Sequence, residues 1–533
     1  MSSTHNAQDP REHSSAGSRS LTEHTLHGVF WVFAGTTAQS LLKVSVTIVL
    51  ARLLSPIEFG IVGAALVIVG FCQIISQLGV GPAVVQRHDL TDGHVKAAFC
   101  ISVTMGICIG LLVYFAAGSI SAFFRIPELE QVVRVLAFLF PIASLGVVAE
   151  GVLQKNMRFK QLSGIEVFSY AAGYGLVGIV CALAGLGIWA LVIAQLAQIS
   201  LQAGFLLKFG SHPKGIRFDK RAVGQLLHFG TGFSLAKVGN AIAIQADNLV
   251  VGRWLGAEAL GSYGRAYQFM MLPTNLFGKV VDSVLFPSMA SVQNDPERLG
   301  RAYLTSVGLV AMVTIPLSGL LTILAPEIVV TLLGAQWSGV IAPFQILTIV
   351  LVFRTSYKMS DTLVRAKGAV YNRAWRQWIY AILVFIGAYL GTFAGLRGVA
   401  VGTGLAIILN FLLMLDLSIK LTNVSWMSFA RVFARHTLIS LPILAGSWAF
   451  VLYARHYGIP SVLVISGTLL GSAIAFLGWF ILFPGTFGDE GRFAMQIIGK
   501  HLPRGRFPFP KQRPALEPLP SAASPGVPRI GDE

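Results

Sequence analysis

Residues 52–60, RLLSPIEFG, and residues 253–261, RWLGAEALG, are two versions of one segment, separated by 201 positions. The matched pairs are His27 with His228, Arg52 with Arg253, Leu54 with Leu255 and Gly60 with Gly261. Each copy follows one apolar run and precedes another, so the chain predicts two related halves. Parallel repeats of this kind are typical of transporters that rock two lobes about a central site. Chance similarity between apolar helices is the alternative interpretation.

The composition around these segments is that of a membrane protein. Hydrophobic residues make up 54% of the 533 positions, charged residues 12%, and the mean hydropathy is +0.70. A helix needs roughly 20 apolar residues to cross the hydrocarbon core. We therefore predict an all-α integral membrane protein of about fourteen spans, with two pseudo-symmetric six-helix lobes and a C-terminal helix pair. The predicted spans are 29–50, 59–78, 97–117, 132–153, 165–184, 188–207, 226–251, 260–285, 304–324, 340–353, 378–393, 398–417, 438–452 and 462–483.

The spans and the polar segments between them divide the chain into six predicted parts. In chain order these are a disordered cytoplasmic N-tail (1–26), an N-lobe (27–208), an amphipathic linker (209–225), a C-lobe (226–420), the last two spans (436–483) and a disordered, basic, Pro-rich tail (484–533). The first 26 residues are polar and lack the layout of a cleaved signal peptide. All four cysteines fall in apolar runs, so we expect no disulfide and no metal site.

The basic residues of the loops predict the orientation. With the N-terminus inside, 20 lysines and arginines lie in or near the inner loops and five, Arg52, Arg125, Arg253, Arg397 and Arg455, in the outer ones. Cytoplasmic loops carry such an excess of cations. Both termini are therefore predicted to be cytoplasmic, in a bacterial inner membrane, and topology explains most of the net charge of +16 without a nucleic-acid partner. Anionic membrane lipids are the expected partners of the cytoplasmic clusters.

Several dispersed segments carry a family resemblance. They are ILARLLSPIEFGIVGAALVI, LGVGPAVVQR, LQKNMRFKQLSGIEVFSY, GLGIWALV, LLHFGTGFSLAKVGNAIAIQADNLVVGRWLGAEALGSYGRAYQF and MLPTNLFGKVVDSVLFPSMA. From residue 27 to residue 483 the chain resembles the Wzx-type oligosaccharide flippases of the polysaccharide transport family. That family lies in the superfamily of the multidrug and toxin extrusion transporters (MOP/MATE-like). Within it the chain is most similar to exporters of colanic-acid-type exopolysaccharide units.

The resemblance implies a transporter, not an enzyme, and no cofactor. Flippases of this family move undecaprenyl-diphosphate-linked oligosaccharide repeat units from the cytoplasmic to the periplasmic leaflet, for exopolysaccharide or lipopolysaccharide biosynthesis. They are described as working by alternating access through a cationic central cavity. The lipid-linked oligosaccharide is the expected substrate, and a polysaccharide polymerase and a chain-length regulator are expected partners.

Polar residues inside the predicted spans are the candidates for the path, because an unpaired charge in lipid costs several kcal/mol. The first span carries a polar stripe at helical spacing, and the seventh carries a similar one. The stripes are Thr36, Gln39, Ser40, Lys43 and Thr47, and Ser234, Lys237, Asn240, Asp247 and Asn248. The 201-residue shift maps three positions of the first stripe onto the second, so both are expected to face a central cleft.

The eighth and second spans supply the remaining candidates. They are Arg265, Gln268, Asn275, Lys279 and Asp282 in the eighth, and Gln73 and Gln77 in the second. We predict a cavity lined by spans one, two, seven and eight. Its diphosphate ligands are Lys43, Lys237, Arg265 and Lys279, since ammonium and guanidinium groups pair with phosphate oxygens.

Other interpretations of these charges stay open. Lys279 with Asp282, and Lys237 with Asp247, could form structural ion pairs, or the two aspartates could serve ion coupling. Arg265 could snorkel to the outer interface, whereas Lys43 has no partner nearby in the sequence. We assign Arg354, Lys358 and Asp361 to interfacial anchoring, keep Asp416 out of the site, and take Glu150 and Glu166 as partners of the basic loop between them.

Two other functions remain as alternatives to a flippase. A multidrug or organic-cation antiporter of the same fold would prefer acidic residues in its N-lobe, where this chain has Lys43. A membrane polysaccharide polymerase or glycosyltransferase would need the long outer loops that this sequence lacks. A scaffold for a sugar-assembly complex is a third alternative. The chain has no phosphate-cradling Gly-Lys-Ser loop of an ATPase.

Overall fold

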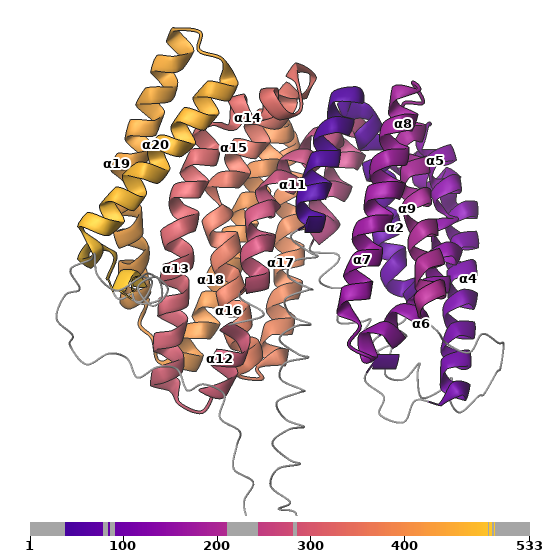
Figure 1. Cartoon of the computed structure of the whole chain (residues 1–533), viewed down its shortest axis with the longest axis horizontal. Coiled ribbons are helices and arrows are strands. Elements are labelled where there is room, and N and C mark those ends of the chain that lie inside the picture. The colour runs from indigo at the N-terminus through magenta and orange to yellow at the C-terminus, as the bar shows by residue number, and fades with distance from the viewer. Residues whose placement is uncertain are drawn as a thin grey trace, which may run out of the picture.

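The computed structural model describes residues 38–77, 81, 84–85, 91–210, 244–280, 285–488, 490–492 and 495. Within these ranges every regular element is helical. Figure 1 shows two helical bodies, the N-lobe on the right and the C-lobe on the left, with the last two long helices at the far left. The ends of α8 and α14 lie at the upper end of the molecule and α12 lies at the lower end.

The N-lobe consists of the elements from the start of the described chain to α9. These are a helix over residues 38–53, α2 (Pro56–Gln77), α4 (Asp92–Phe124), α5 (Leu129–Leu136), α6 (Leu139–Lys155), α7 (Phe159–Ser169), the π-helix η1 (Tyr170–Val177), α8 (Gly178–Leu183) and α9 (Ile188–Phe209). The segments α5–α6 and α7–η1–α8 each run in the direction of one span. They match the predicted spans 132–153 and 165–184.

The C-lobe repeats this arrangement and the chain ends in a helical hairpin. The C-lobe elements are a helix over residues 244–254, α11 (Gly256–Val280), α12 (Phe286–Ser291), α13 (Pro296–Ile323), α14 (Ala325–Leu332), η3 (Ala335–Val340), α15 (Ile341–Ile349), α16 (Leu351–Ala366), α17 (Val370–Gly391), η4 (Thr392–Ala394) and α18 (Gly395–Thr422). The hairpin is α19 (Trp426–His456) and α20 (Ser461–Leu482), followed by η5 (Pro484–Phe487).

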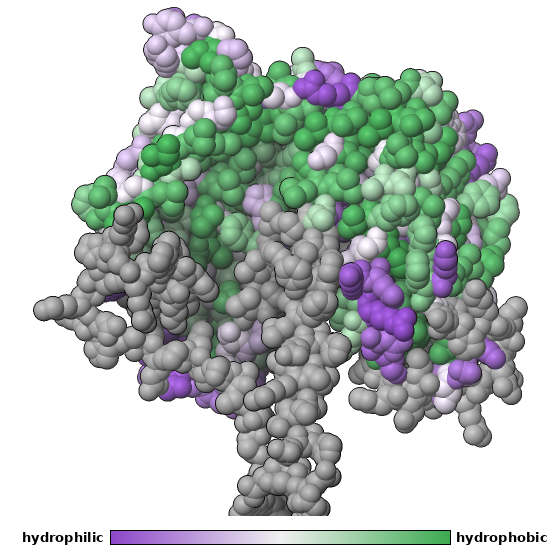
Figure 2. Space-filling view, viewed as in Figure 1, coloured by the Kyte–Doolittle hydropathy of each residue, from purple (hydrophilic) through white to green (hydrophobic). Residues whose placement is uncertain are grey.

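The surface confirms a multi-pass membrane protein. Among the described residues, nine helical stretches are long and apolar enough to span a bilayer, or ten with one bent pair. One of the nine, Tyr371–Thr422, contains both α17 and α18. Figure 2 shows a broad belt of hydrophobic residues with hydrophilic residues at its edges, far more exposed apolar surface than soluble monomers carry. The count of fourteen stays a prediction, because parts of spans one and seven lie outside the described residues.

The predicted tenth span, 340–353, is a bent helix pair. It runs from η3 through α15 into α16, with a 46° bend at Val350. The apolar run ends near Phe353, but α16 continues to Ala366 with mostly buried residues. The predicted span is too short because α16 is polar and packs inside the protein rather than against lipid.

Close helix packing in the C-lobe depends on glycines. Gly387 and Gly391 of α17 face Gly402 and Gly398 of α18, and a Cβ atom at any of the four would overlap the backbone of the partner helix. Small residues allow this approach of two helices in a membrane. Arg455 of α19 binds Glu327 of α14 through two contacts of 2.7 and 3.0 Å. This pair attaches the C-terminal hairpin to the C-lobe.

The ordered part of the C-terminus extends past the predicted boundary at residue 484. Residues 484–487 form η5, and Phe487 is fully buried against Phe476 and Phe480. Glu490 is also buried and pairs with Arg435 at 3.4 Å. The start of the predicted disordered tail is therefore corrected, and most of the tail lies outside the described residues, as do the N-tail and most of the linker.

The two lobes meet where helices α2 and α11 cross. A Cβ atom at Gly60 would overlap the carbonyl oxygen of Ala257, and one at Gly261 would overlap that of Pro56. Gly60 and Gly261 are related by the 201-residue shift, and so are Pro56 and Ala257. The contact is therefore reciprocal between the repeats. This geometry supports the internal repeat over chance similarity, because unrelated helices have no reason to exchange the same contact.

Further contacts join the lobes on the same upper side of the molecule. Arg52 donates to two carbonyl oxygens of α14, that of Thr331 and that of Leu332. The contact with Leu332 measures 3.1 Å. Arg253, its repeat partner, lies over the Phe123 ring at 5.4 Å. We call the contacts of residues 51–60 with residues 257–261 and 331–337 the lobe seam. The structure is thus closed at its upper end, which the positive-inside rule predicts to be periplasmic.

Candidate functional site

Lys43 lies beside a tyrosine of the fifth predicted span. Its Nζ atom is 5.7 Å from the centroid of the Tyr170 ring. Glu166, one turn earlier on α7, is close enough to interact with Lys43 electrostatically. Lys43 therefore has a carboxylate neighbour that its own span does not reveal, and Glu166 belongs with the site from which the sequence analysis excluded it.

Arg265 approaches the same region from the C-lobe. Its guanidinium carbon is 4.7 Å from the centroid of the Phe59 ring, on α2 of the N-lobe. Tyr170 and Tyr174 are within electrostatic range of this guanidinium. The Nε atom is buried and has no hydrogen-bond partner among the described residues. Arg265 thus lies between the lobes rather than reaching the outer interface, which contradicts the snorkelling alternative.

The two tyrosines that these cations share lie on a π-helix. Tyr170 and Tyr174 of η1 stack with a centroid distance of 5.1 Å and an interplanar angle of 19°. Gly173 between them faces the backbone of Gln198 in α9 so closely that a Cβ atom would not fit. π-Helical turns are rare and frequent at functional sites. Neither tyrosine was among the predicted site residues. The four-residue spacing of Glu166, Tyr170 and Tyr174 in the sequence does indicate that the three share one helix face.

Other predicted residues lie at or near the contact between the lobes. Gln268 of α11 donates to the Thr47 hydroxyl at 3.3 Å, which links the eighth predicted span to the first. Gln39 is half-buried, and Asn275 is exposed. Spans one and eight therefore meet at Thr47 and Gln268. The predicted cavity between spans one, two, seven and eight stays a prediction.

Gln73 faces a different space. It lines a cavity of about 100 Å³ inside the N-lobe, between α2, α4, α6 and α9. The hydroxyl groups of Ser102 and Ser144 at this cavity donate to the carbonyl oxygens of Ser144 and Pro141. The cavity is small, and the hydroxyl groups of its two serines already donate to carbonyl oxygens. Neither Lys43 nor Arg265 lines it.

Seven predicted positions fall where the structure gives no side chain. Thr36, Ser234, Lys237, Asn240 and Asp282 lie outside the described residues, and Gln77 and Lys279 lie in helices whose side chains are not described at these positions. The predicted equivalence of the polar stripes in spans one and seven, and the two alternative ion pairs of Lys237 and Lys279, therefore stay predictions.

Asp247 is buried inside the C-lobe, with 1% of its surface exposed. Its Oδ2 atom accepts a hydrogen bond from the Tyr263 hydroxyl at 2.8 Å, and its Oδ1 atom accepts one from the backbone N–H of Asn248 at 2.8 Å. The Tyr263 hydroxyl also lies 3.1 Å from the Thr403 hydroxyl. These contacts connect the seventh predicted span with α11 and α18, and they place Asp247 away from the pair of cations.

The assignment of Arg354 and Asp361 to interfacial anchoring was wrong. Both are buried in the C-lobe, with 8% and 6% of their surfaces exposed. Arg354 donates to the Tyr380 hydroxyl at 2.8 Å and lies in electrostatic range of Asp247. Asp361 pairs with Arg373 at 2.5 Å and with Arg365 at 3.2 Å. The amphipathic α16 turns its polar side inward, which a span-by-span count of apolar residues cannot reveal.

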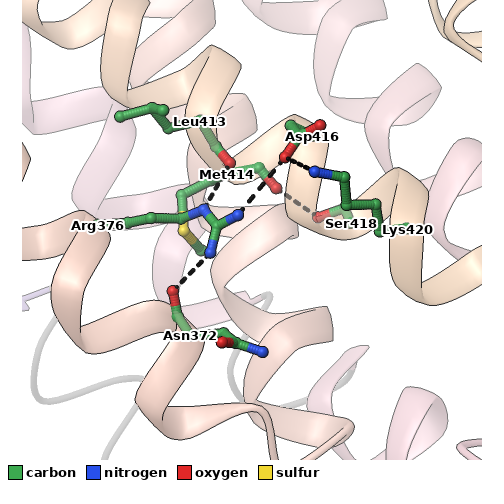
Figure 3. Close-up of polar contacts among 7 residues, drawn as sticks. All are labelled: Asn372, Arg376, Leu413, Met414, Asp416, Ser418 and Lys420. Atoms are coloured by element: carbon green, nitrogen blue, oxygen red, sulfur yellow. Dashed lines mark hydrogen bonds and ion pairs between the residues drawn. The ribbon is translucent and has the colours of Figure 1, made fainter.

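Asp416 belongs to a second structural network, shown in Figure 3. Arg376 of α17 donates to the carbonyl oxygens of Leu413, at 3.1 Å, and Asn372, at 2.8 Å, and lies 3.5 Å from the Asp416 carboxylate. Lys420 contacts the same carboxylate at 2.8 Å. Because its donors are used in joining α17 to α18, Arg376 has a structural role.

No group of three or more His, Cys, Asp and Glu side chains that could hold a metal ion occurs in the described part of the chain. The four cysteines are all unpaired thiols. The described side chains where the lobes meet include cations, tyrosines, amides and the Glu166 carboxylate. The charged N–H donors of Lys43 and Arg265 are suited to an anionic ligand.

Comparison with known proteins gives related sequences over most of the chain. The teichuronic acid biosynthesis protein TuaB of Bacillus subtilis is 24% identical over 468 residues, which cover 86% of this chain and 95% of that protein. The lipopolysaccharide biosynthesis protein WzxC of Escherichia coli is 25% identical over 439 residues, 81% of this chain and 88% of that protein. The predicted resemblance to polysaccharide transport proteins is confirmed.

A solved structure and a family model complete the comparison. The inward closed conformation of the lipid II flippase MurJ matches 87% of this chain and 99% of its own length with a TM-score of 0.71 and 17% identity, which confirms the predicted fold class. The model of the family described as polysaccharide biosynthesis protein matches residues 49–342, more than half of the chain. The chain therefore belongs to the polysaccharide biosynthesis protein family.

Proposed function

We propose that the protein is a flippase that moves lipid-linked oligosaccharide repeat units across the membrane for polysaccharide biosynthesis. The observation that carries this proposal is that two cations from opposite lobes lie near Tyr170: Lys43 lies over its ring at 5.7 Å, and Arg265 is within electrostatic range of it. Related proteins that act in teichuronic acid and lipopolysaccharide biosynthesis, and the MurJ-like fold, support it.

The two cations suit a diphosphate. Charged N–H donors form short, strong hydrogen bonds with phosphate oxygens, and the buried Nε atom of Arg265 has no partner in the described structure. A diphosphate offers negatively charged oxygens to both lobes at once, whereas a neutral sugar chain has no charge to pair with the two cations. The finer identity of the lipid as undecaprenyl diphosphate is part of the proposal.

Binding by both lobes fits alternating access. In the described state the lobes are closed at the lobe seam, on the side predicted to face the periplasm. A substrate held between Lys43 and Arg265 would enter from the opposite side and leave when the seam opens. We further propose an inner-membrane location with both termini in the cytoplasm, and a polymerase and a chain-length regulator as partners that receive the product.

The test is leaflet transfer in proteoliposomes with a fluorescent polyprenyl-diphosphate glycan, read by chemical quenching of the outer leaflet. We expect transfer by the wild type and strongly reduced transfer by Lys43→Ala and Arg265→Ala. Lys208→Ala, which removes an exposed cation at the end of α9, is the matched control and should transfer normally.

Two results would count against the proposal. Wild-type rates in both site variants would remove the site assignment. Absence of glycan transfer together with efflux of organic cations would identify the protein as an antiporter of the same fold.

The orientation is tested by replacing Phe393, an exposed residue of η4, with cysteine and labelling intact cells from outside. The periplasmic assignment of the upper end requires that this cysteine is labelled.

A further inference from the structure

A continuous path of contacts links Arg265 to the backbone of the N-lobe through the lobe seam. The Arg265 guanidinium lies over the Phe59 ring at 4.7 Å. The Phe59 ring meets the edge of Trp337 with a centroid distance of 5.4 Å and an angle of 70°. Trp337 in turn donates from Nε1 to the Ala51 carbonyl oxygen at 2.7 Å. Arg265 and Trp337 belong to the C-lobe, and Phe59 and Ala51 belong to the N-lobe, so each contact of the path joins one lobe to the other.

The path lies where the lobes must separate. Phe59 precedes Gly60, whose contact with Ala257 brings the backbones of α2 and α11 together. Phe59 and Trp337 are 5% and 0% exposed. Gln336, next to Trp337, also donates to the Ala51 carbonyl oxygen, at 3.2 Å. Opening of the upper end therefore has to break the Phe59–Trp337 contact and the hydrogen bonds to Ala51.

The path exists in one repeat alone. The 201-residue shift places Leu260 at the position of Phe59, Ala64 at the position of Arg265, and Leu136 at the position of Trp337. The glycine crossing, by contrast, is reciprocal. The glycine crossing therefore follows the repeat, whereas the aromatic path does not. Because the reciprocal glycine contact by itself brings the lobes together, the aromatic path is not needed for closure and calls for another role.

Arg265 has a choice of partners at this point. In the described structure its contacts are with aromatic rings, and its Nε atom has no hydrogen-bond partner. A cation over a ring is held by a weaker attraction than a guanidinium paired with phosphate oxygens. An anion between the lobes therefore competes with the Phe59 ring for the guanidinium.

We propose that Phe59 and Trp337 are positioning residues that couple the binding of a phosphate-bearing lipid at Arg265 to opening of the lobe seam. When phosphate oxygens draw the guanidinium away, the Phe59 ring loses the cation that covers one face and packs less firmly against Trp337. The hydrogen bonds to Ala51 then hold the upper end less tightly. This inference rests on the proposed function, since it takes the lipid diphosphate as the anion.

The experiment measures the distance across the upper end with and without ligand. Spin labels are placed at exposed Leu186, in the turn before α9, and exposed Phe393, in η4, after the four native cysteines are replaced by serine. Double electron–electron resonance is recorded with polyprenyl diphosphate, and with neutral polyprenol as the control ligand. In the wild type, the diphosphate is expected to increase the long-distance population and the polyprenol to leave it unchanged.

Three variants test the path itself. Phe59→Leu should show an increased long-distance population without ligand, by roughly threefold to thirtyfold, and little further change on adding diphosphate. Phe59→Tyr keeps the ring face and should retain the response of the wild type. Phe344→Leu removes a buried ring of the C-lobe outside the seam and is the matched control, with an expected wild-type response.

The outcomes separate this inference from the proposed function. A full diphosphate-dependent shift in Phe59→Leu, or diphosphate binding by the wild type without any shift, would overturn the coupling and leave the flippase proposal intact. Binding is followed separately, by quenching of a fluorescent polyprenyl diphosphate. Absence of binding to the wild type would overturn the proposed substrate and the coupling with it.

Discussion

Arg265 and Arg354 are two arginines of the same lobe in different places. Arg354 is buried inside the C-lobe, where it donates to the Tyr380 hydroxyl and lies in electrostatic range of the Asp247 carboxylate. Arg265 lies between the lobes, over the Phe59 ring and in electrostatic range of Tyr170 and Tyr174. Both guanidinium groups lie over an aromatic ring, but Arg354 also has a side-chain hydrogen bond and a carboxylate of its own lobe in range.

This difference indicates different roles. A buried cation with a hydrogen-bond acceptor and a carboxylate in range forms part of the structure, and removing it leaves the opposite charge uncompensated. The Nε atoms of both guanidinium groups are buried and have no hydrogen-bond partner among the described residues, so the difference lies in their position. Arg265 lies between the lobes, over Phe59 of the N-lobe, where a ligand that passes between the lobes would meet it. Stability and transport measurements on the two positions should therefore differ, and the following predictions start with the largest expected effect.

Replacing Arg354 should destabilise the protein most. We expect Arg354→Leu to cost up to about 3 kcal/mol of folding free energy, because the buried Tyr380 hydroxyl loses its charged donor and Asp247 loses the cation in its electrostatic range. The measurement is the thermal unfolding midpoint in detergent, followed by tryptophan fluorescence. The double variant Arg354→Leu/Asp247→Asn removes both charges and should recover part of the loss. An unchanged midpoint with loss of transport would instead make Arg354 a ligand-binding residue.

A methyl group at the helix crossing should impair the seam without affecting the C-lobe core. Gly60→Ala places a Cβ atom against the Ala257 carbonyl oxygen, and overpacking of this kind costs about 1–3 kcal/mol. The closed state bears this cost, so the upper end should open more often and transport should fall. Gly63→Ala, whose Cβ atom would meet side-chain carbons at 3.8 Å, is the control. Equal transport rates in the two variants would contradict the tight crossing.

Replacing Arg265 should reduce transport while leaving stability nearly unchanged. We expect Arg265→Gln to lower the rate of glycan transfer about tenfold, a loss of about 1.4 kcal/mol in transition-state stabilisation. Its unfolding midpoint should match the wild type, because no ion pair is broken in the described structure. Unfolding at a temperature as low as that of Arg354→Leu would show that the two arginines have the same structural role.

Lys420 should have the smallest effect. It is exposed and shares the Asp416 carboxylate with Arg376 (Figure 3), and exposed pairs contribute about 0–1 kcal/mol. Lys420→Ala should therefore unfold and transport like the wild type. Arg376→Ala is the contrasting variant, since Arg376 is 6% exposed and binds two carbonyl oxygens of neighbouring segments. If Lys420→Ala is as unstable as Arg376→Ala, the network depends on all three charges.

The candidate site was only partly predictable from the sequence. Lys43 and Arg265 stand out because a charge inside an apolar run is costly and needs a reason. Tyr170, Glu166 and Phe59 did not stand out, since aromatic residues are common in spans and the carboxylate was matched to nearby loop cations. Their importance comes from which helix lies opposite which, and packing between distant segments decides that.

Arg354 shows where reasoning from single spans goes wrong. Placed after a short apolar run, it has the position of an interfacial anchor, but the 46° bend at Val350 carries α16 into the C-lobe. Its polar side then faces α11 and α13. The hydroxyl groups of Thr355 and Thr274 of α11 are 3.2 Å apart, and those of Ser360 and Tyr303 of α13 are 2.8 Å apart. Hydropathy measures the average preference of a segment for an apolar environment over water, and it does not reveal that one polar face of the helix packs inside the protein.

The sequence alone establishes a helical membrane protein built of two repeats, with cations inside those repeats. Apolar runs need lipid, and the segments RLLSPIEFG and RWLGAEALG relate the halves without any structure. The folded chain adds that Gly60 and Gly261 exchange contacts, that Lys43 and Arg265 both lie near Tyr170, and that Arg354 is held inside the C-lobe. Hydropathy and charge act locally along the chain, whereas these contacts depend on how the helices cross, and some of them join residues more than a hundred positions apart.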